Sequence, residues 1–100
     1  MNVDMKEMQD ADQLVVRSEG NMVSDMNGER VMFNAGTGKY YNLGRIGGRI
    51  WDLIASPVGI HRLVDELTAE YEIEREVCER EVGVFLRQLY RESLIEVRSA

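Results

Sequence analysis

The feature that most constrains this chain is a change of hydrophobic period within residues 39–54, KYYNLGRIGGRIWDLI. The first five residues form a short aromatic run whose side chains alternate between two faces, as in a β-strand. After Gly44, three isoleucines and Trp51 recur every three or four residues, which is the period of an amphipathic helix. A strand therefore runs directly into a helix. We expect strands and turns before this stretch and helices after it.

Two turn signals divide the segment before Lys39 into strands. Asn27-Gly28 lies between β-capable runs at 22–26 and 30–34, and Asn-Gly favours a two-residue hairpin because both turn positions need positive φ. Residues 35–38, AGTG, predict a second turn. The chain should therefore form an antiparallel meander of three strands. The last of these strands would lie at an edge of the sheet unless another segment covers it.

Side chains alternate between the two faces of a strand, so the strands also predict which residues lie together. Val31 and Phe33 share one face of the second strand, and Met32 points to the other. The third strand divides its side chains into two pairs, Tyr40 with Asn42 and Tyr41 with Leu43. Either pair could face a bound partner.

Three helices are predicted after the strands, over residues 44–55, 60–71 and 73–91. The first has a buried stripe made of Ile46, Ile50, Trp51 and Ile54. Gly47-Gly48 within it costs about 1 kcal/mol per glycine relative to alanine, which indicates a close approach to the strands. The last helix has a core stripe consisting of Cys78, Val82, Phe85, Leu86 and Leu89. Beside it runs a half-polar stripe, Val77, Glu81, Val84 and Gln88.

Length and composition suit one small domain: the chain has 100 residues, 44% hydrophobic and 30% charged. Residues 1–13 should form a flexible tail, and residues 14–98 the domain. Residues 14–17 predict an initial strand, and residues 94–97 predict a short closing one. No apolar run reaches the roughly 18 residues of a membrane span, and the start of the chain does not resemble a secretory signal. A single cysteine suits the reducing cytoplasm.

No catalytic constellation is visible, and we expect neither enzyme activity nor a cofactor. The chain has one histidine, His61, and one cysteine, Cys78, which cannot form a common zinc site. Cys78 lies in a helical stripe and is better explained as a small core residue than as a nucleophile. GRIGG lacks the lysine-serine ending of a phosphate-binding loop. An enzyme that uses Cys78 or His61 is the weakest hypothesis.

The charge also disfavours nucleic acid as a partner. The formal net charge is −6, and positive residues are interleaved with acids at 74–76 and 79–81. A winged-helix DNA-binding regulator would share the helical layout, but it needs a basic face to neutralise phosphates. The free edge of the third strand instead favours a peptide that adds to the sheet as a further strand. The last helix would then form the other wall of a groove.

Several runs resemble the PqqD-like proteins, the precursor-peptide recognition elements of ribosomally made and post-translationally modified peptides. The matching runs are Gly38 to Leu43, Gly48 to Ile54, Leu63 to Leu67, Val82, Phe85 to Leu89 and Leu94-Ile95. The resemblance extends over roughly residues 14–97. Two departures stand out: Val58-Gly59 replaces a threonine-type helix cap, and Glu92-Ser93-Leu94 replaces a turn on glycine.

The resemblance implies an α+β, winged-helix-like fold with a three-stranded antiparallel sheet followed by three helices. It also implies a leader peptide paired with the third strand and packed against the third helix. The candidate peptide-binding residues are Val31, Phe33, Tyr40, Tyr41, Asn42, Leu43, Val77, Glu81, Val84, Phe85 and Gln88.

Partners follow from the same resemblance, which is nearest to the leader-binding proteins of lasso-peptide clusters. The implied partners are the precursor leader, a cysteine protease that removes it, and an ATP-dependent macrocyclase. A radical SAM peptide-modifying enzyme is the alternative partner. Neither nucleic acid nor a membrane is expected.

Overall fold

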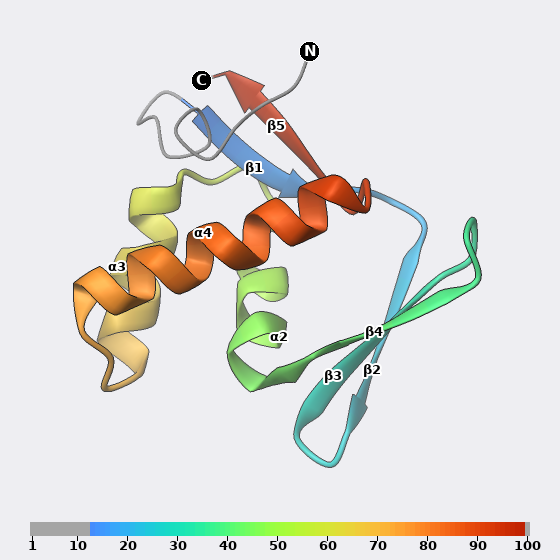
Figure 1. Ribbon diagram of the computed structural model, residues 1–100, viewed down its shortest axis with the longest axis horizontal. Coiled ribbons are helices and arrows are strands. Elements are labelled where there is room, and N and C mark those ends of the chain that lie inside the picture. Colours follow the sequence, from blue (N-terminus) through green and yellow to red (C-terminus); the bar gives the residue numbers. More distant parts are fainter. Residues whose placement is uncertain (1–12, 100) are drawn as a thin grey trace.

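The computed structural model describes residues 13–99. Its elements in chain order are β1 (Gln13–Arg17), β2 (Asn21–Met26), β3 (Glu29–Asn34), β4 (Lys39–Leu43), α2 (Gly44–Leu53), α3 (Ile60–Glu70), α4 (Arg75–Arg91) and β5 (Ile95–Ser99). Strands β2, β3 and β4 form an antiparallel sheet in that order, and the three helices gather beside it (Figure 1). The predicted α+β, winged-helix-like fold is therefore confirmed.

A second, two-stranded sheet joins the two ends of the described chain. Strand β1 pairs antiparallel with β5, with Val15 opposite Val97. The sequence predicted both strands but not their pairing. Val15 also bridges to Val58, in the connection between α2 and α3. The predicted tail lies outside the described residues except for Gln13, which belongs to β1.

The meander forms as its turn residues predict. Asn27 and Gly28 have φ values of 59° and 87°, as the Asn-Gly hairpin requires. Strand β4 runs into α2 without a loop, through Gly44 at a φ of 72°. Its neighbour β3 sends Met32 into the core, where the side chain is completely buried.

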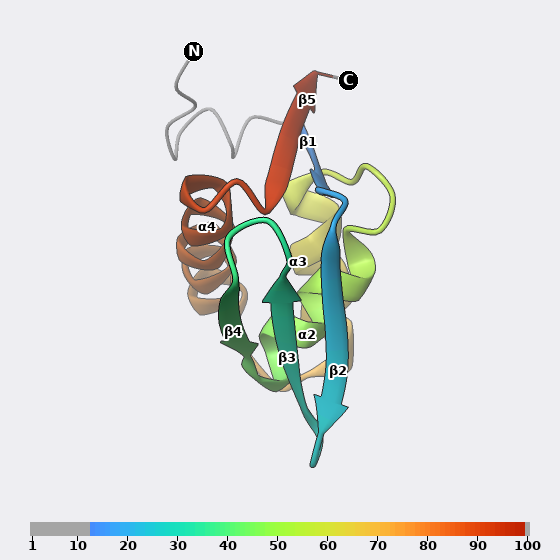
Figure 2. The ribbon, with the colours of Figure 1, turned by 90° about the vertical axis from the view of Figure 1, so that its right-hand side faces the viewer.

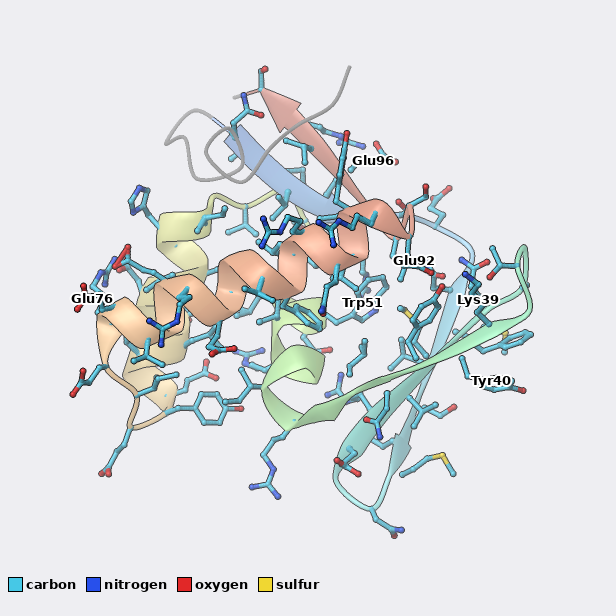
Figure 3. The ribbon with its side chains drawn as sticks, viewed as in Figure 1. Lys39, Tyr40, Trp51, Glu76, Glu92 and Glu96 are labelled. Carbon is cyan, nitrogen blue, oxygen red and sulfur yellow. The ribbon has the colours of Figure 1, made fainter. Side chains whose placement is uncertain are left out.

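The outer face of the sheet carries the alternate residues of β3 and β4. Phe33 lies opposite Tyr40, and their ring centroids are 4.7 Å apart. Val31 lies opposite Asn42. Tyr40 is 72% exposed, and in Figure 3 its side chain points away from the helices.

The helix boundaries differ from the prediction at three ends. Helix α2 ends at Leu53 rather than residue 55, and α3 ends at Glu70. Helix α4 begins at Arg75 because Glu74, with a ψ of 141°, is its extended N-cap. Ile73, which was predicted to start this helix, therefore lies in the connection between α3 and α4.

The core contains most of the predicted helical stripes. Buried positions include Ile50, Trp51 and Ile54 of the α2 segment and Cys78, Val82, Leu86 and Leu89 of α4. Trp51 lies under Arg17, whose guanidinium carbon is 5.6 Å from the ring centroid and whose Nη1 donates to the Trp51 carbonyl. Ile46 was predicted to be buried, but this is wrong: 40% of it is exposed. It lies in the first turn of α2, beside an open hollow described below.

A close approach between α2 and β3 explains one of the paired glycines. A Cβ on Gly48 would come within 3.0 Å of the Arg30 Cβ and closer still to its Cγ. Arg30 is held there by a bidentate pair with Asp52, with N–O distances of 2.6 and 2.9 Å. It also donates from Nε to Asp25 at 2.9 Å. Gly47 faces α4 instead, because its Cβ would meet the Phe85 ring at 3.0 Å.

We expect Gly48→Ala to lower the free energy of unfolding by about 1 kcal/mol. At an exposed helical position, replacing glycine with alanine would instead raise it by about 1 kcal/mol. The new methyl group meets the base of an arginine side chain that two carboxylates hold in place. Urea denaturation measures the change. Arg45→Ala, an exposed substitution in the same helix, should change it by less than about 0.5 kcal/mol. A Gly48→Ala variant more stable than the wild type would contradict the close packing.

The C-terminal end of α4 adopts a Schellman motif without glycine. The Leu94 amide donates to the Leu89 carbonyl at 2.9 Å, and the Ser93 amide donates to the Tyr90 carbonyl at 3.0 Å. Ser93 has a φ of 61°, and the buried Leu94 provides the accompanying apolar contact. Serine therefore stands in a left-handed conformation that glycine adopts at lower cost. Serine thus replaces the glycine expected from the resemblance, and the turn at the end of α4 still forms.

Ser93→Gly should raise the free energy of unfolding by about 0.5 to 1 kcal/mol, because it removes the strain of a left-handed serine. Chemical denaturation of the two proteins measures the difference. Ser56→Gly is the matched control, since Ser56 is exposed and does not have positive φ. That control should be neutral or slightly destabilising. Equal effects at the two serines would show that the conformation of Ser93 costs nothing.

Candidate functional site

Strand β4 forms one edge of the three-stranded sheet, as predicted. Within the described residues it pairs only with β3. Figure 2 shows β4 at the outer side of the sheet, with α4 beside it. Its outward N–H and C=O groups are therefore open to a further strand.

A polar contact holds the start of β4 against the end of α4. Tyr41 Oη donates to Glu92 Oε1 at 2.8 Å, and Lys39 Nζ lies 3.2 Å from the same oxygen. Figure 3 shows Lys39 and Glu92 close together at this end of the helix. The hydrogen bond from Tyr41 and the charge of Lys39 lower the pKa of Glu92, and the Glu92 carboxylate raises the pKa of Tyr41. We call these three residues the Glu92 clasp.

The other end of β4 opens into an apolar hollow of about 350 Å³ between α2 and α4. It is lined by Leu43, Ile46, Gly47, Ile50, Leu67, Ile73, Cys78, Glu81, Val82 and Phe85. Gly47 is placed here because a side chain at its position would meet the Phe85 ring. Ile46 and Glu81 are exposed, while Leu43 is buried. The hollow can accept an apolar side chain of a bound molecule.

The structure brings three of the candidate residues to this hollow, namely Leu43, Glu81 and Phe85. Val77, Val84 and Gln88 are also on α4 but do not line it. The sequence missed Ile46, which was assigned to the core, and Ile73, which was assigned to a helix. One signal in the sequence could have found them. Both isoleucines lie near the start of a predicted helix, and side chains in the first turn of a helix are covered by fewer neighbouring residues.

The remaining candidates divide between the two faces of the sheet. Tyr41 faces the helices through the Glu92 clasp, on the same side as Leu43. The other four candidates lie on the outer face and are Val31, Phe33, Tyr40 and Asn42. The Asn42 carboxamide oxygen accepts a hydrogen bond from the Gly44 amide at 3.0 Å, which supports the passage from strand to helix.

A larger, mostly polar hollow of about 1180 Å³ lies between the β1–β5 ribbon, β2 and the end of α2. Its arginines are engaged within the protein. Arg30 pairs with Asp52, Arg17 lies over Trp51, and Arg98 pairs with Glu96. Of these contacts, the one between Arg17 and Trp51 joins the ribbon to α2.

Cys78 and His61, the residues of the enzyme hypothesis, lie in different settings. Cys78 is buried in α4, and this burial raises the pKa of its thiol, which disfavours the reactive thiolate. His61 is exposed on α3. Among residues 13–99 there is no group of three potential metal ligands. Nor does this part of the chain contain a helix long and apolar enough to cross a membrane.

Residues 29–95 match the family described as Coenzyme PQQ synthesis protein D (PqqD). The chain belongs to the PqqD family. The match begins at β3 and ends at β5, so it includes the β4 edge, all three helices and the hollow between them. A comparison with curated proteins gave no match.

Two solved structures resemble this PqqD-family chain. The first, TbiB1 in complex with the TbiA(beta) leader peptide, is 32% identical, with a TM-score of 0.72. The similarity covers 81% of this chain and 94% of that one. The second, a lasso peptide synthetase B1 complexed with the leader peptide, is 20% identical, with a TM-score of 0.62. It covers 82% of this chain and 96% of the other, and it shows a shared fold.

The Glu92 clasp should stabilise the protein in a pH-dependent way. Because folding lowers the pKa of Glu92, its contribution is present at neutral pH and is lost as pH falls through that lowered pKa. We therefore expect Glu92→Gln to be less stable than wild type at pH 7. The difference between the two proteins should shrink as pH falls from 7 through the lowered pKa of Glu92, as followed by urea denaturation.

Glu72→Gln is the control, since it removes the charge of an exposed glutamate between α3 and α4. Its effect should be small over the same pH range. A Glu92→Gln deficit that did not shrink over this range would mean that the carboxylate charge is not what stabilises the clasp.

Proposed function

We propose that this protein binds the leader region of a ribosomally synthesised precursor peptide by strand addition to β4, with α4 as the second wall. The main support is its 32% identity with TbiB1, whose structure is a complex with a leader peptide. The free β4 edge beside an apolar hollow is the matching feature in this chain. A strand added there gains main-chain hydrogen bonds, and the hollow provides side-chain specificity.

The pattern of exposure is consistent with a partner at this place. Ile46 is 40% exposed and Val84 36%, and they lie on the two helices that flank the groove. Covering such side chains is favourable by about 25 cal/mol per Å² of apolar surface. A bound leader would cover both, whereas an empty groove leaves them in water.

The direction of the β4 side chains supports Tyr41 and Leu43 as the pair that faces the leader. Tyr41 and Leu43 face the helices, so leader side chains on that side of the added strand would enter the groove. Those on the other side would extend the outer face beside Tyr40. The outer-face candidates Val31 and Phe33 then act indirectly, by packing the sheet that presents β4.

This function needs no catalytic group in the chain. The protein would hold the leader and raise the local concentration of the precursor at a separate enzyme. In a lasso-peptide pathway that enzyme is a cysteine protease that removes the leader, followed by an ATP-dependent macrocyclase, all in the cytoplasm. A radical SAM peptide-modifying enzyme is the alternative partner, favoured only by the family's link to coenzyme PQQ synthesis.

Proline substitutions test strand addition. Adjacent N–H groups of an edge strand alternate between the neighbouring strand and the open side. Tyr41→Pro and Asn42→Pro each remove one N–H group, and only one of the two groups points to the open side of β4. The variant that loses this outward N–H should stay folded and bind the leader about tenfold more weakly. The other should destabilise the β3–β4 pair. Fluorescence titration with a labelled leader peptide from the adjacent precursor gene measures affinity, and circular dichroism checks folding.

Alanine at the same two positions is the control, because it removes the side chain and keeps the N–H. Val84→Glu tests the opposite wall by placing a charge on α4. A folded protein that binds the leader equally well with either proline would refute strand addition. Normal binding by Val84→Glu would remove that part of α4 from the site.

A further inference from the structure

Within residues 13–99, Glu81 is the only charged residue that lines the apolar hollow. Its side chain is exposed, and the surrounding walls are apolar residues of α2, α3 and α4. No hydrogen bond or ion pair involving Glu81 is found within residues 13–99. A carboxylate in this position is unusual beside a surface that is otherwise suited to an apolar ligand.

Two other carboxylates near the groove are already engaged within the protein. At the opposite end of β4, Glu92 is engaged by Lys39 and Tyr41. Between α2 and α3, Arg49 forms two hydrogen bonds of 2.8 Å with Glu70. Glu81 differs from these two carboxylates, because it borders the hollow and has no hydrogen-bond or ion-pair partner in the described part of the chain.

We propose that Glu81 selects leader peptides carrying a lysine or arginine beside the apolar side chain that enters the hollow. This inference rests on the proposed leader binding and specifies the peptide's chemistry. A bound peptide removes water from the apolar walls around Glu81, so the carboxylate must find a new partner. A cation supplies one, whereas a neutral or acidic residue leaves the carboxylate poorly solvated or repelled.

Strand geometry sets the spacing of the two leader residues. Glu81 and Phe85 are one helical turn apart, with Cβ atoms about 5 to 6 Å from one another. Residues two apart in a strand point to the same side and are separated by about 6.6 Å. The apolar residue and the cation should therefore be two positions apart in the leader, with any residue between them.

The test is a charge exchange between protein and peptide. The probe is a labelled synthetic peptide spanning the leader of the adjacent precursor, together with variants in which each lysine or arginine is replaced singly by glutamate. Affinity is measured for wild type, Glu81→Gln and Glu81→Lys. Glu76→Gln is the matched control, because it removes the same charge from α4 at a residue that does not line the hollow. Figure 3 shows Glu76 at the start of this helix.

We expect Glu81→Gln to weaken binding of the native leader about three- to tenfold, and Glu81→Lys to weaken it further. Glu76→Gln should bind as the wild type does. Among the glutamate-substituted peptides, one replaces the lysine or arginine that lies two positions from the apolar residue. That peptide should bind the Glu81→Lys protein more tightly than it binds the wild-type protein. Raising the salt concentration should narrow the difference between wild type and Glu81→Gln.

The outcomes separate this inference from the function on which it rests. Native-leader binding that is equal in wild type and Glu81→Gln would overturn the role of Glu81 and leave leader binding intact. Equal losses for Glu81→Gln and Glu76→Gln would also overturn it, because they would report only the total charge of α4. Failure of the folded wild type to bind the leader would overturn both proposals.

Discussion

The close approach of α2 to β3 is the constraint on which the rest of the structure depends. It requires Gly48, because a side chain there would occupy the space of the Arg30 stem. It also requires the bidentate pair between Arg30 and Asp52, which joins the sheet to the helix through two short hydrogen bonds. With α2 held against the sheet, β4 can pass into it directly at Gly44, and the direction of the edge strand is determined.

The groove is a consequence of this arrangement. One wall is the edge of β4, the other is α4, and α2 lies between them at one end. Gly47 and Phe85 bring α2 and α4 together at the hollow, while the Glu92 clasp connects β4 to the opposite end of α4. Two separate contacts thus set the distance between the walls. The Schellman motif at Ser93 supports the clasp by placing Glu92 at the helix terminus and returning the chain to β5.

Local patterns predicted the elements well. Asn27-Gly28 specified a hairpin because its conformational preference is local, and the isoleucine and tryptophan spacing specified α2 for the same reason. The candidate site was predicted only in outline. Leu43, Glu81 and Phe85 lie together at the hollow, whereas Val31 and Phe33 lie on the outer face and Ile46 is exposed beside the groove. Periodicity shows which residues share a face but does not say which face another element covers.

The sequence by itself determined the order and type of the elements and the family, because these depend on local spacing and on runs of matching residues. It placed the third strand at an edge only on the condition that no other segment covers it, and the described residues meet that condition. Only the tertiary structure decided that β1 pairs with β5, that Ile46 stays exposed, and that Tyr41 rather than Tyr40 faces the helices. It also decided that Glu81, among many interleaved charges, borders an apolar hollow. Each of these depends on contacts between distant segments, and the energy of such contacts leaves no periodic trace in the chain.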